Sequence, residues 1–187
     1  MKKILALMLA MALSLALFVG CGGDDPSSEG NSSSQSGSSS ESSALPAYDV
    51  EQVLEAIESA VPVSSGKEID DDTLTLLMNV DMENVEAYAG KITQLNQNTD
   101  QILVIQAKPG KADAVKTELE ARRQAMVDSS ANYSEFAGEK VKAENGRVVV
   151  KGDYVVLVIV GDSQKMLDEG PDDTYKAVDK AIDEAFN

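Results

Sequence analysis

The hydrophobic and polar positions divide the chain into three stretches of different character. In the first, an apolar run from Ile4 to Val19, interrupted only by Ser14, follows the basic pair Lys2-Lys3. A basic start and a short apolar run before small residues are typical of a secretion signal. The run is shorter than the roughly 20 residues that a membrane-spanning helix needs. The pattern therefore predicts a signal peptide over residues 1–20, with an uncleaved membrane span as the alternative.

The second stretch is polar and rich in serine. Between Ser27 and Ser43 it has eleven serines among seventeen residues. Such a segment cannot bury enough apolar surface to offset the entropy lost on ordering, so it is expected to stay disordered. A Gly/Ser-rich chain of this length reaches roughly 25 to 30 Å. Residues 21–45 are therefore predicted to form a flexible tether.

The third stretch, residues 46–187, has the periodicity of a folded domain. Apolar residues recur at helical spacing after Asp49, a residue suited to an N-cap, and the run stops at Pro62. This pattern predicts an amphipathic helix. Further helical segments are expected after Asp70-Asp71-Asp72, at Met82 to Asn84, at Lys111 to Val127, at Ser134 to Val141, and after a turn at Asp168 to Asp173.

Strands are indicated by runs of β-branched residues. A strand is expected to end about Leu95, and Gln101 to Lys108 has the pattern of a buried strand. Arg147 to Lys151 and Tyr154 to Val160 flank Gly152-Asp153, which predicts a two-residue hairpin. The expected fold class is α+β: an antiparallel sheet of about four strands with helices packed mainly on one face.

The amino-acid composition excludes several kinds of functional site. The chain has no histidine, one cysteine and a net charge of -16. These counts exclude disulfide frameworks, His-based metal sites, and Ser-His or Cys-His nucleophile pairs. So acidic a chain repels the phosphates of nucleic acids, which are therefore not expected as partners. No cofactor, metal site or catalytic residue is predicted.

The single cysteine follows Leu17-Phe18-Val19-Gly20, and together they form a lipobox. Cleavage between Gly20 and Cys21 would expose Cys21 for lipidation through its thiol, with fatty-acyl chains such as palmitate. Two acyl chains on one residue suffice for stable anchoring. The pattern predicts a protein anchored by lipid to the cell membrane, on its extracytoplasmic face. An ordinary signal with a chance cysteine is the alternative.

The lipobox, the Ser-rich tether and two sequence blocks carry a family resemblance. The blocks are Ile102 to Lys116, with Lys108-Pro109-Gly110-Lys111 at its centre, and the hairpin Val148 to Ile159. The chain resembles the bacterial lipoprotein family with the domain of unknown function numbered 4358. The resemblance implies a Clostridia-type Gram-positive source and a domain on the outer side of a single membrane. The family has no assigned activity, so it implies no catalytic residues.

Three groups of side chains in the domain could carry chemistry. The acidic clusters Asp70-Asp71-Asp72 and Asp168 to Asp173 could bind Mg²⁺ or Ca²⁺, although their positions suit helix caps and turns. The arginines Arg122, Arg123 and Arg147 could bind an anion, but they are predicted to be solvated ion-pair partners, with Glu118 placed to pair with Arg122. Tyr133, Phe136 and Tyr154 could form a ligand platform, but core packing is favoured.

Two function classes follow from these residues. The favoured one is a non-catalytic binding or interaction module of the cell envelope, because the domain has neither a nucleophile–base pair nor a metal motif. The alternative is a carboxylate-based, metal-dependent hydrolase at the cell surface. The sequence identifies no ligand-binding residue and no protein or small-molecule partner.

Overall fold

The computed structural model describes residues 47–187. The signal peptide, Cys21 and the tether lie outside the described residues, so these expectations stay predictions. Within residues 47–187 the helices are α1 (Val50–Ala60), α2 (Ala112–Ala131), α3 (Ala137–Asn145), α4 (Ser163–Glu169) and α5 (Asp172–Ala185). The strands are β1 (Gly66–Glu68), β2 (Val85–Thr93), β3 (Gln101–Ala107), β4 (Arg147–Lys151) and β5 (Tyr154–Ile159). Short turns of other helix types lie at Thr73–Leu77, Met82–Asn84 and Ser134–Phe136.

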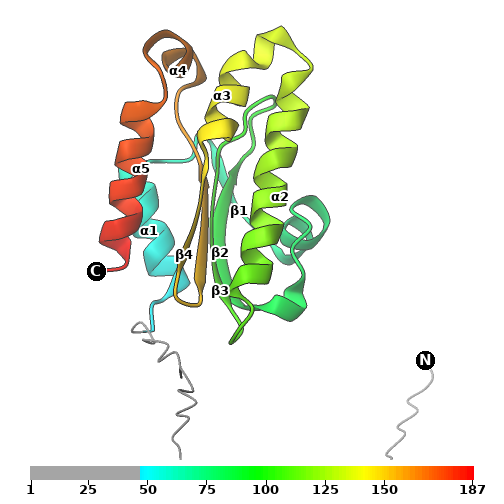
Figure 1. Ribbon diagram of the computed structural model, residues 1–187, viewed down its shortest axis with the longest axis vertical. Coiled ribbons are helices and arrows are strands. Elements are labelled where there is room, and N and C mark those ends of the chain that lie inside the picture. Colours follow the sequence, from blue (N-terminus) through cyan, green and yellow to red (C-terminus); the bar gives the residue numbers. More distant parts are fainter. Residues whose placement is uncertain (1–46) are drawn as a thin grey trace, which may run out of the picture. The chain divides into compact units, whose positions relative to one another are not determined.

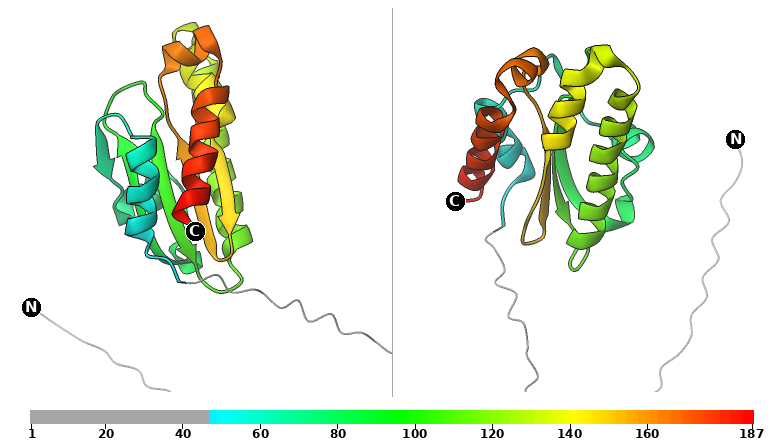
Figure 2. Two further views of the ribbon diagram at one scale, coloured as in Figure 1. Left: turned by 90° about the vertical axis from the view of Figure 1, so that its left-hand side faces the viewer. Right: turned by 45° about the horizontal axis from the view of Figure 1, so that its top comes forward.

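All five strands form one antiparallel sheet in the order β1-β2-β3-β5-β4 (Figure 1). The central strands β3 and β5 are almost entirely buried, because both of their faces are covered. α1 and α5 lie side by side on one face, and α2 lies on the other (Figures 1 and 2). The α+β class is therefore confirmed.

The arrangement of the helices differs from the expectation. Helices cover both faces of the sheet rather than mainly one, and a fifth strand, β1, extends one edge. The continuous apolar run Ile102 to Ile105 is the physical reason, since its side chains point alternately to the two faces and need cover on both. One hydrophobic cluster of residues in the described part of the chain fills each interface.

Local signals explain most of the elements. Asp49 caps α1 by accepting hydrogen bonds from the backbone N–H groups of Glu51 and Gln52. The hairpin of β4 and β5 turns at Gly152, where φ is 61°, a value that favours glycine. The structure adds α4 before the turn expected at Asp168 to Asp173. No helix in the described part of the chain is long and apolar enough to cross a bilayer.

Candidate functional site

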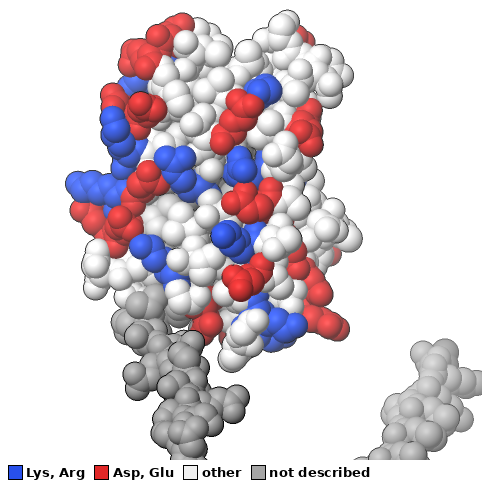
Figure 3. Space-filling model, viewed as in Figure 1, with Lys and Arg blue, Asp and Glu red and all other residues white. Residues whose placement is uncertain are grey.

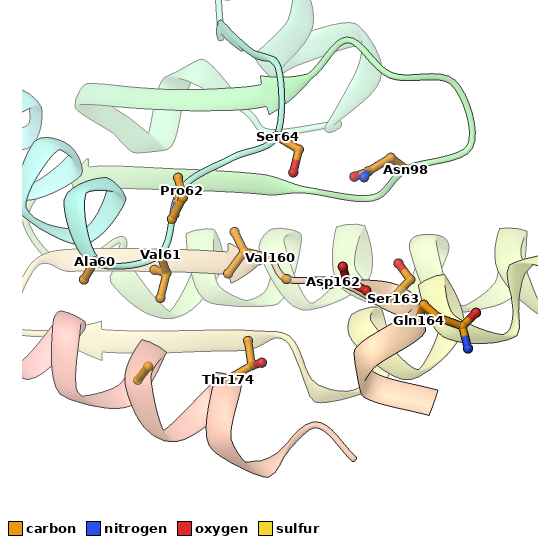
Figure 4. A pocket seen from close by; sticks show the side chains of 12 residues that line it. Ala60, Val61, Pro62, Ser64, Asn98, Val160, Asp162, Ser163, Gln164 and Thr174 are labelled. Carbon is orange, nitrogen blue, oxygen red and sulfur yellow. The ribbon is translucent and has the colours of Figure 1, made fainter. Parts of the chain in front are cut away.

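A groove of about 570 Å³ lies at the end of the domain where α1 ends and α4 and α5 begin. Four segments form its walls: the end of α1 with the chain after it, the β2–β3 loop, the β5–α4 connection with the first turn of α4, and the first half of α5. Figure 4 shows Ser64 and Asn98 on one side and Asp162, Ser163 and Gln164 on the other. The residues that line the groove are Ala60, Val61, Pro62, Ser64, Asn98, Val160, Gly161, Asp162, Ser163, Gln164, Thr174 and Ala177.

A sharp turn at Gly161 forms the groove wall between β5 and α4. Gly161 has φ at 123°, a conformation that residues with a side chain rarely adopt. A Cβ atom there would lie 2.5 Å from the Cε atom of Met166 and 3.0 Å from the Cγ2 atom of Thr174. Asp162 then caps α4 by accepting from the backbone N–H of Lys165. Glycine at this turn therefore brings Asp162 and Ser163 to the groove.

A buried ionic cluster, made of Asp100, Glu139 and Lys142, lies behind the groove wall. The Lys142 side chain is fully buried, and its Nζ atom lies 2.6 Å from Asp100 Oδ1 and 2.9 Å from Glu139 Oε2. It also donates to the carbonyl oxygen of Gly161 at 3.3 Å and to Asn98 Oδ1 at 3.4 Å. Because an ammonium has three protons to donate, its donors are fully used inside the protein. Lys142 therefore joins α3, the start of β3 and the β5–α4 turn.

Glu139 connects the ionic cluster to the groove. Its carboxylate accepts from the hydroxyl of Ser163, which lines the groove, and from the N–H and the hydroxyl of Thr99. Burial raises the pKa of Glu139, but hydrogen bonds from Ser163 and Lys142 outweigh it and hold the pKa below its ordinary value. Glu139 is thus an anion at neutral pH and a poor proton acceptor for Ser163. The Ser163–Glu139 pair is suited to positioning and not to nucleophilic catalysis.

Comparison with protein families gives one match. The family model described as "Domain of unknown function (DUF4358)" matches residues 48–160, which is more than half of the chain. The chain belongs to the DUF4358 family. Neither the search of curated proteins nor the search of solved structures found a match. The matched residues include the ionic cluster, whereas Ser163, α4 and α5 follow the matched segment of this DUF4358 domain.

The first acidic cluster of the DUF4358 domain, Asp70-Asp71-Asp72, makes hydrogen bonds that hold the fold together. Asp70 accepts from the backbone N–H and the hydroxyl of Thr73, and these bonds lower its pKa to about 2. Asp71 accepts from the hydroxyl of Tyr88 at 2.5 Å. Burial, and then this bond, raise the pKa of Tyr88 to about 12. The predicted capping role is therefore confirmed for Asp70, whereas Asp71 instead bonds to β2 and Asp72 makes no capping hydrogen bond.

The second acidic cluster likewise lies outside the groove. Asp168 accepts from the amide of Gln164, and Asp173 pairs with Lys176 at 3.6 Å. Across residues 47–187, no group of three or more potential metal ligands of the types His, Cys, Asp and Glu gathers in one place.

The arginines are not brought together. Arg123 pairs with Glu120 and Arg147 with Asp179, as expected of surface ion pairs. Figure 3 shows basic and acidic side chains interspersed on this face of the domain rather than gathered by sign. Arg147 also lies over the ring of Tyr175, 4.8 Å from its centroid.

The predicted pairing of Glu118 with Arg122 is wrong. Arg122 is buried and donates to Gln101 Oε1 and to the carbonyl oxygen of Leu77. Glu118 instead accepts from the backbone N–H of Asp81 and the amide of Asn84. Tertiary partners have displaced the weak helical pair, which is worth only about 0.2–0.5 kcal/mol.

The aromatic residues do not form a ligand platform. Tyr154 is buried, and its hydroxyl bonds to the backbone of Tyr48, so the favoured core role is confirmed for this residue. Tyr133 packs edge-on against Phe136 but is 56% exposed. None of the three lines the groove.

Sequence reasoning missed the residues of the ionic cluster. Lys142 and Asp100 are 42 positions apart, and Thr99 and Glu139 are 40 apart, so no local spacing connects them. The one local signal is the i,i+3 spacing of Glu139 and Lys142 on a helix, which is also common in solvated pairs.

Proposed function

We propose that this protein is a lipid-anchored, non-catalytic binding module of the cell envelope, and that the groove is its ligand site. The observation that carries the proposal is the position of the groove relative to Tyr48, near the start of the described chain. Tyr48 lies before the first turn of α1. Ala60, which lines the groove, is the last residue of α1. An 11-residue helix spans about 16 Å, so the two features lie at opposite ends of α1.

The last helix, α5, also runs from the groove to the Tyr48 end of the domain. α5 begins beside the groove, which its Thr174 lines, and ends before Phe186, whose carbonyl oxygen accepts from the hydroxyl of Tyr48 at 2.7 Å. A chain anchored at Cys21 would be joined to the membrane through the Tyr48 end of the domain, whereas the groove lies at the opposite end. The point of attachment therefore leaves the groove open to a ligand outside the membrane.

The chemistry of the groove favours binding over turnover. The donors of Lys142 are used inside the protein, Glu139 has a lowered pKa, and the chain has no histidine to activate Ser163. The carboxylate-based hydrolase is the second candidate from the sequence, and no observation in residues 47–187 favours it.

Photo-crosslinking in intact cells tests the groove as the ligand site. A photoreactive amino acid at Gln164 lies in the groove, whereas one at Asp153 lies in the exposed β4–β5 turn at the Tyr48 end. The proposal predicts a crosslinked product from position 164 and little from position 153. Equal products from both positions, or products from position 153 alone, would show that the groove is not the ligand site.

Membrane fractionation tests the anchor separately. Cys21→Ser removes the only thiol of the chain and should move the protein from the membrane to the soluble fraction. If the Cys21→Ser protein still fractionated with membranes, the segment Ile4 to Val19 would be an uncleaved span and the lipid anchor would be wrong.

A further inference from the structure

We infer that the groove binds a primary or secondary ammonium group carried on a short apolar body. This inference rests on the proposed function, because it names the ligand class of the same groove. It follows from the charges that line the groove, the charges behind its wall and the side-chain types that form its surface.

The lining itself is acidic. Asp162 is the one ionisable side chain among the twelve lining residues, and it is exposed. Its bond to the N–H of Lys165 uses one of about four acceptor positions on the carboxylate. Because neither Lys nor Arg lines the groove, the charge of Asp162 is offset there only in part, by the N-terminus of α4 that it caps. An incoming ammonium therefore meets a carboxylate with acceptor positions to spare.

The ionic cluster adds negative charge behind the wall. It contains two carboxylates and a single ammonium, so it holds one net negative charge. Glu139 reaches the groove through Ser163, and charges act over longer distances when little water screens them. Residues 47–187 as a whole have 28 Asp and Glu against 14 Lys and Arg, which also attracts cations.

An anionic ligand finds no comparable partner. Lys142 is fully buried, and its donors point into the protein. The first turn of α5, which lies beside the groove, contains Asp172 and Asp173, whose charges oppose the positive end of the helix dipole. A carboxylate or phosphate would therefore bind next to like charges.

The side-chain types select among cations. Quaternary ammonium groups have no N–H to donate and are usually held in aromatic cages, but the lining has no aromatic residue. Primary and secondary ammonium groups instead donate to oxygen atoms, which Ser64, Ser163 and Thr174 supply beside Asp162. An apolar wall for the body of the ligand is formed by Val61, Pro62, Val160 and Ala177.

Titration with three matched probes tests the inference. The protein is the chain from Gly22 onward, which retains both hydrophobic clusters, and the signal is the amide shifts in ¹H–¹⁵N spectra. The probes are n-butylammonium, n-butyltrimethylammonium and butyrate. Saturable shifts are expected at the groove residues with n-butylammonium alone.

A pair of variants locates the charge that matters. Asp162→Asn keeps a residue that caps α4 well but removes the carboxylate, and should weaken n-butylammonium binding about fivefold to tenfold. Asp153→Asn makes the same change of charge in the β4–β5 turn and should leave the affinity unchanged.

The outcomes separate this inference from the proposed function. If butyrate or n-butyltrimethylammonium shifts the groove amides as strongly as n-butylammonium, the ligand class is wrong while the groove stays a binding site. Unchanged affinity of Asp162→Asn also overturns the inference. If none of the probes shifts the groove amides while the Gln164 crosslink forms, the ligand class alone fails; if the crosslink is missing too, both fail.

Discussion

The two ends of the sheet are closed by opposite chemistry. At the aromatic end, the rings of Tyr48, Tyr154 and Phe186 pack against one another at centroid distances of 5.0 to 5.8 Å. The Tyr154 hydroxyl accepts from the N–H of Tyr48 and donates to its carbonyl oxygen, both at 2.8 Å. At the groove end, the charged residues of the ionic cluster are buried beside apolar residues such as Val160 and Met166.

The two ways of closing the sheet differ in their energetic cost. Aromatic packing closes a sheet with little desolvation of charge, and a buried ion pair rarely stabilises more than apolar residues of the same volume would. The ionic cluster is therefore a costly way to close the groove end. Its hydrogen bonds to Ser163, Thr99 and the carbonyl oxygen of Gly161 fix the loops at this end in place, which apolar side chains of the same volume could not do.

The largest expected effect comes from removing the cation of the ionic cluster. Lys142→Met leaves Asp100 and Glu139 buried without their partner and should lower the free energy of unfolding by about 3–5 kcal/mol. Lys151→Met is the control, because it breaks a partly exposed pair with Asp183 and should cost less than about 1 kcal/mol. Urea unfolding measures both, and similar losses in the two variants would contradict the account.

The next effect distinguishes the two glycines that flank α4. Gly161→Ala combines a positive φ with crowding by Thr174, whose Cγ2 atom would lie 3.0 Å from the new Cβ atom, and should cost about 2 kcal/mol. Gly170→Ala has a positive φ but open space around its Cβ, so it should cost about 1 kcal/mol. Thermal unfolding compares them; a larger loss for Gly170→Ala would mean that the Gly161 turn is not tightly packed.

A smaller effect is expected at the aromatic end. Tyr154→Phe keeps the ring packing but removes both hydrogen bonds to Tyr48, and should cost about 1–2 kcal/mol. Binding of n-butylammonium should not change, because the groove lies at the other end of α1. Weaker binding in this variant would show that the two ends are coupled.

The pH dependence of stability isolates Glu139. Its ordinary pKa is 4.5, and folding lowers this pKa. The unfolded chain therefore binds a proton at this carboxylate at a higher pH than the folded protein does. Its contribution to stability is therefore present above about pH 4.5 and is lost as the pH falls through the lower, folded pKa. Glu139→Gln should flatten the pH dependence of unfolding in this acidic range. An unchanged slope would show that Glu139 has an ordinary pKa.

Much of the fold could be predicted from the sequence because its signals are local. Asp49 and Pro62 bound α1, and Gly152-Asp153 sets the hairpin. β1 could not be predicted, since its three residues are exposed and gain their order from pairing with β2. The apolar run Ile102 to Ile105 indicates that both faces of β3 need cover, but the pattern of one segment cannot show which distant helices supply it.

The candidate site was harder to predict than the fold. Each contact of Lys142 with Asp100 or Gly161 joins residues that are far apart in the chain. The sequence instead indicated acidic turns such as Asp70 to Asp72, which lie outside the groove and bond to Thr73 and Tyr88. The lipobox at Cys21 is a local sequence motif. The sequence therefore predicts a membrane anchor but identifies no ligand.

Hydrogen–deuterium exchange tests the contrast between the two ends most directly, because it samples the whole backbone without choosing a site. The mature protein would be compared on isolated cell envelopes and, as the chain from Gly22 onward, in solution. The account predicts added protection on envelopes at the groove end, over residues 60–64 and 161–170, with none over residues 151–154 at the aromatic end. Protection confined to the aromatic end would contradict it.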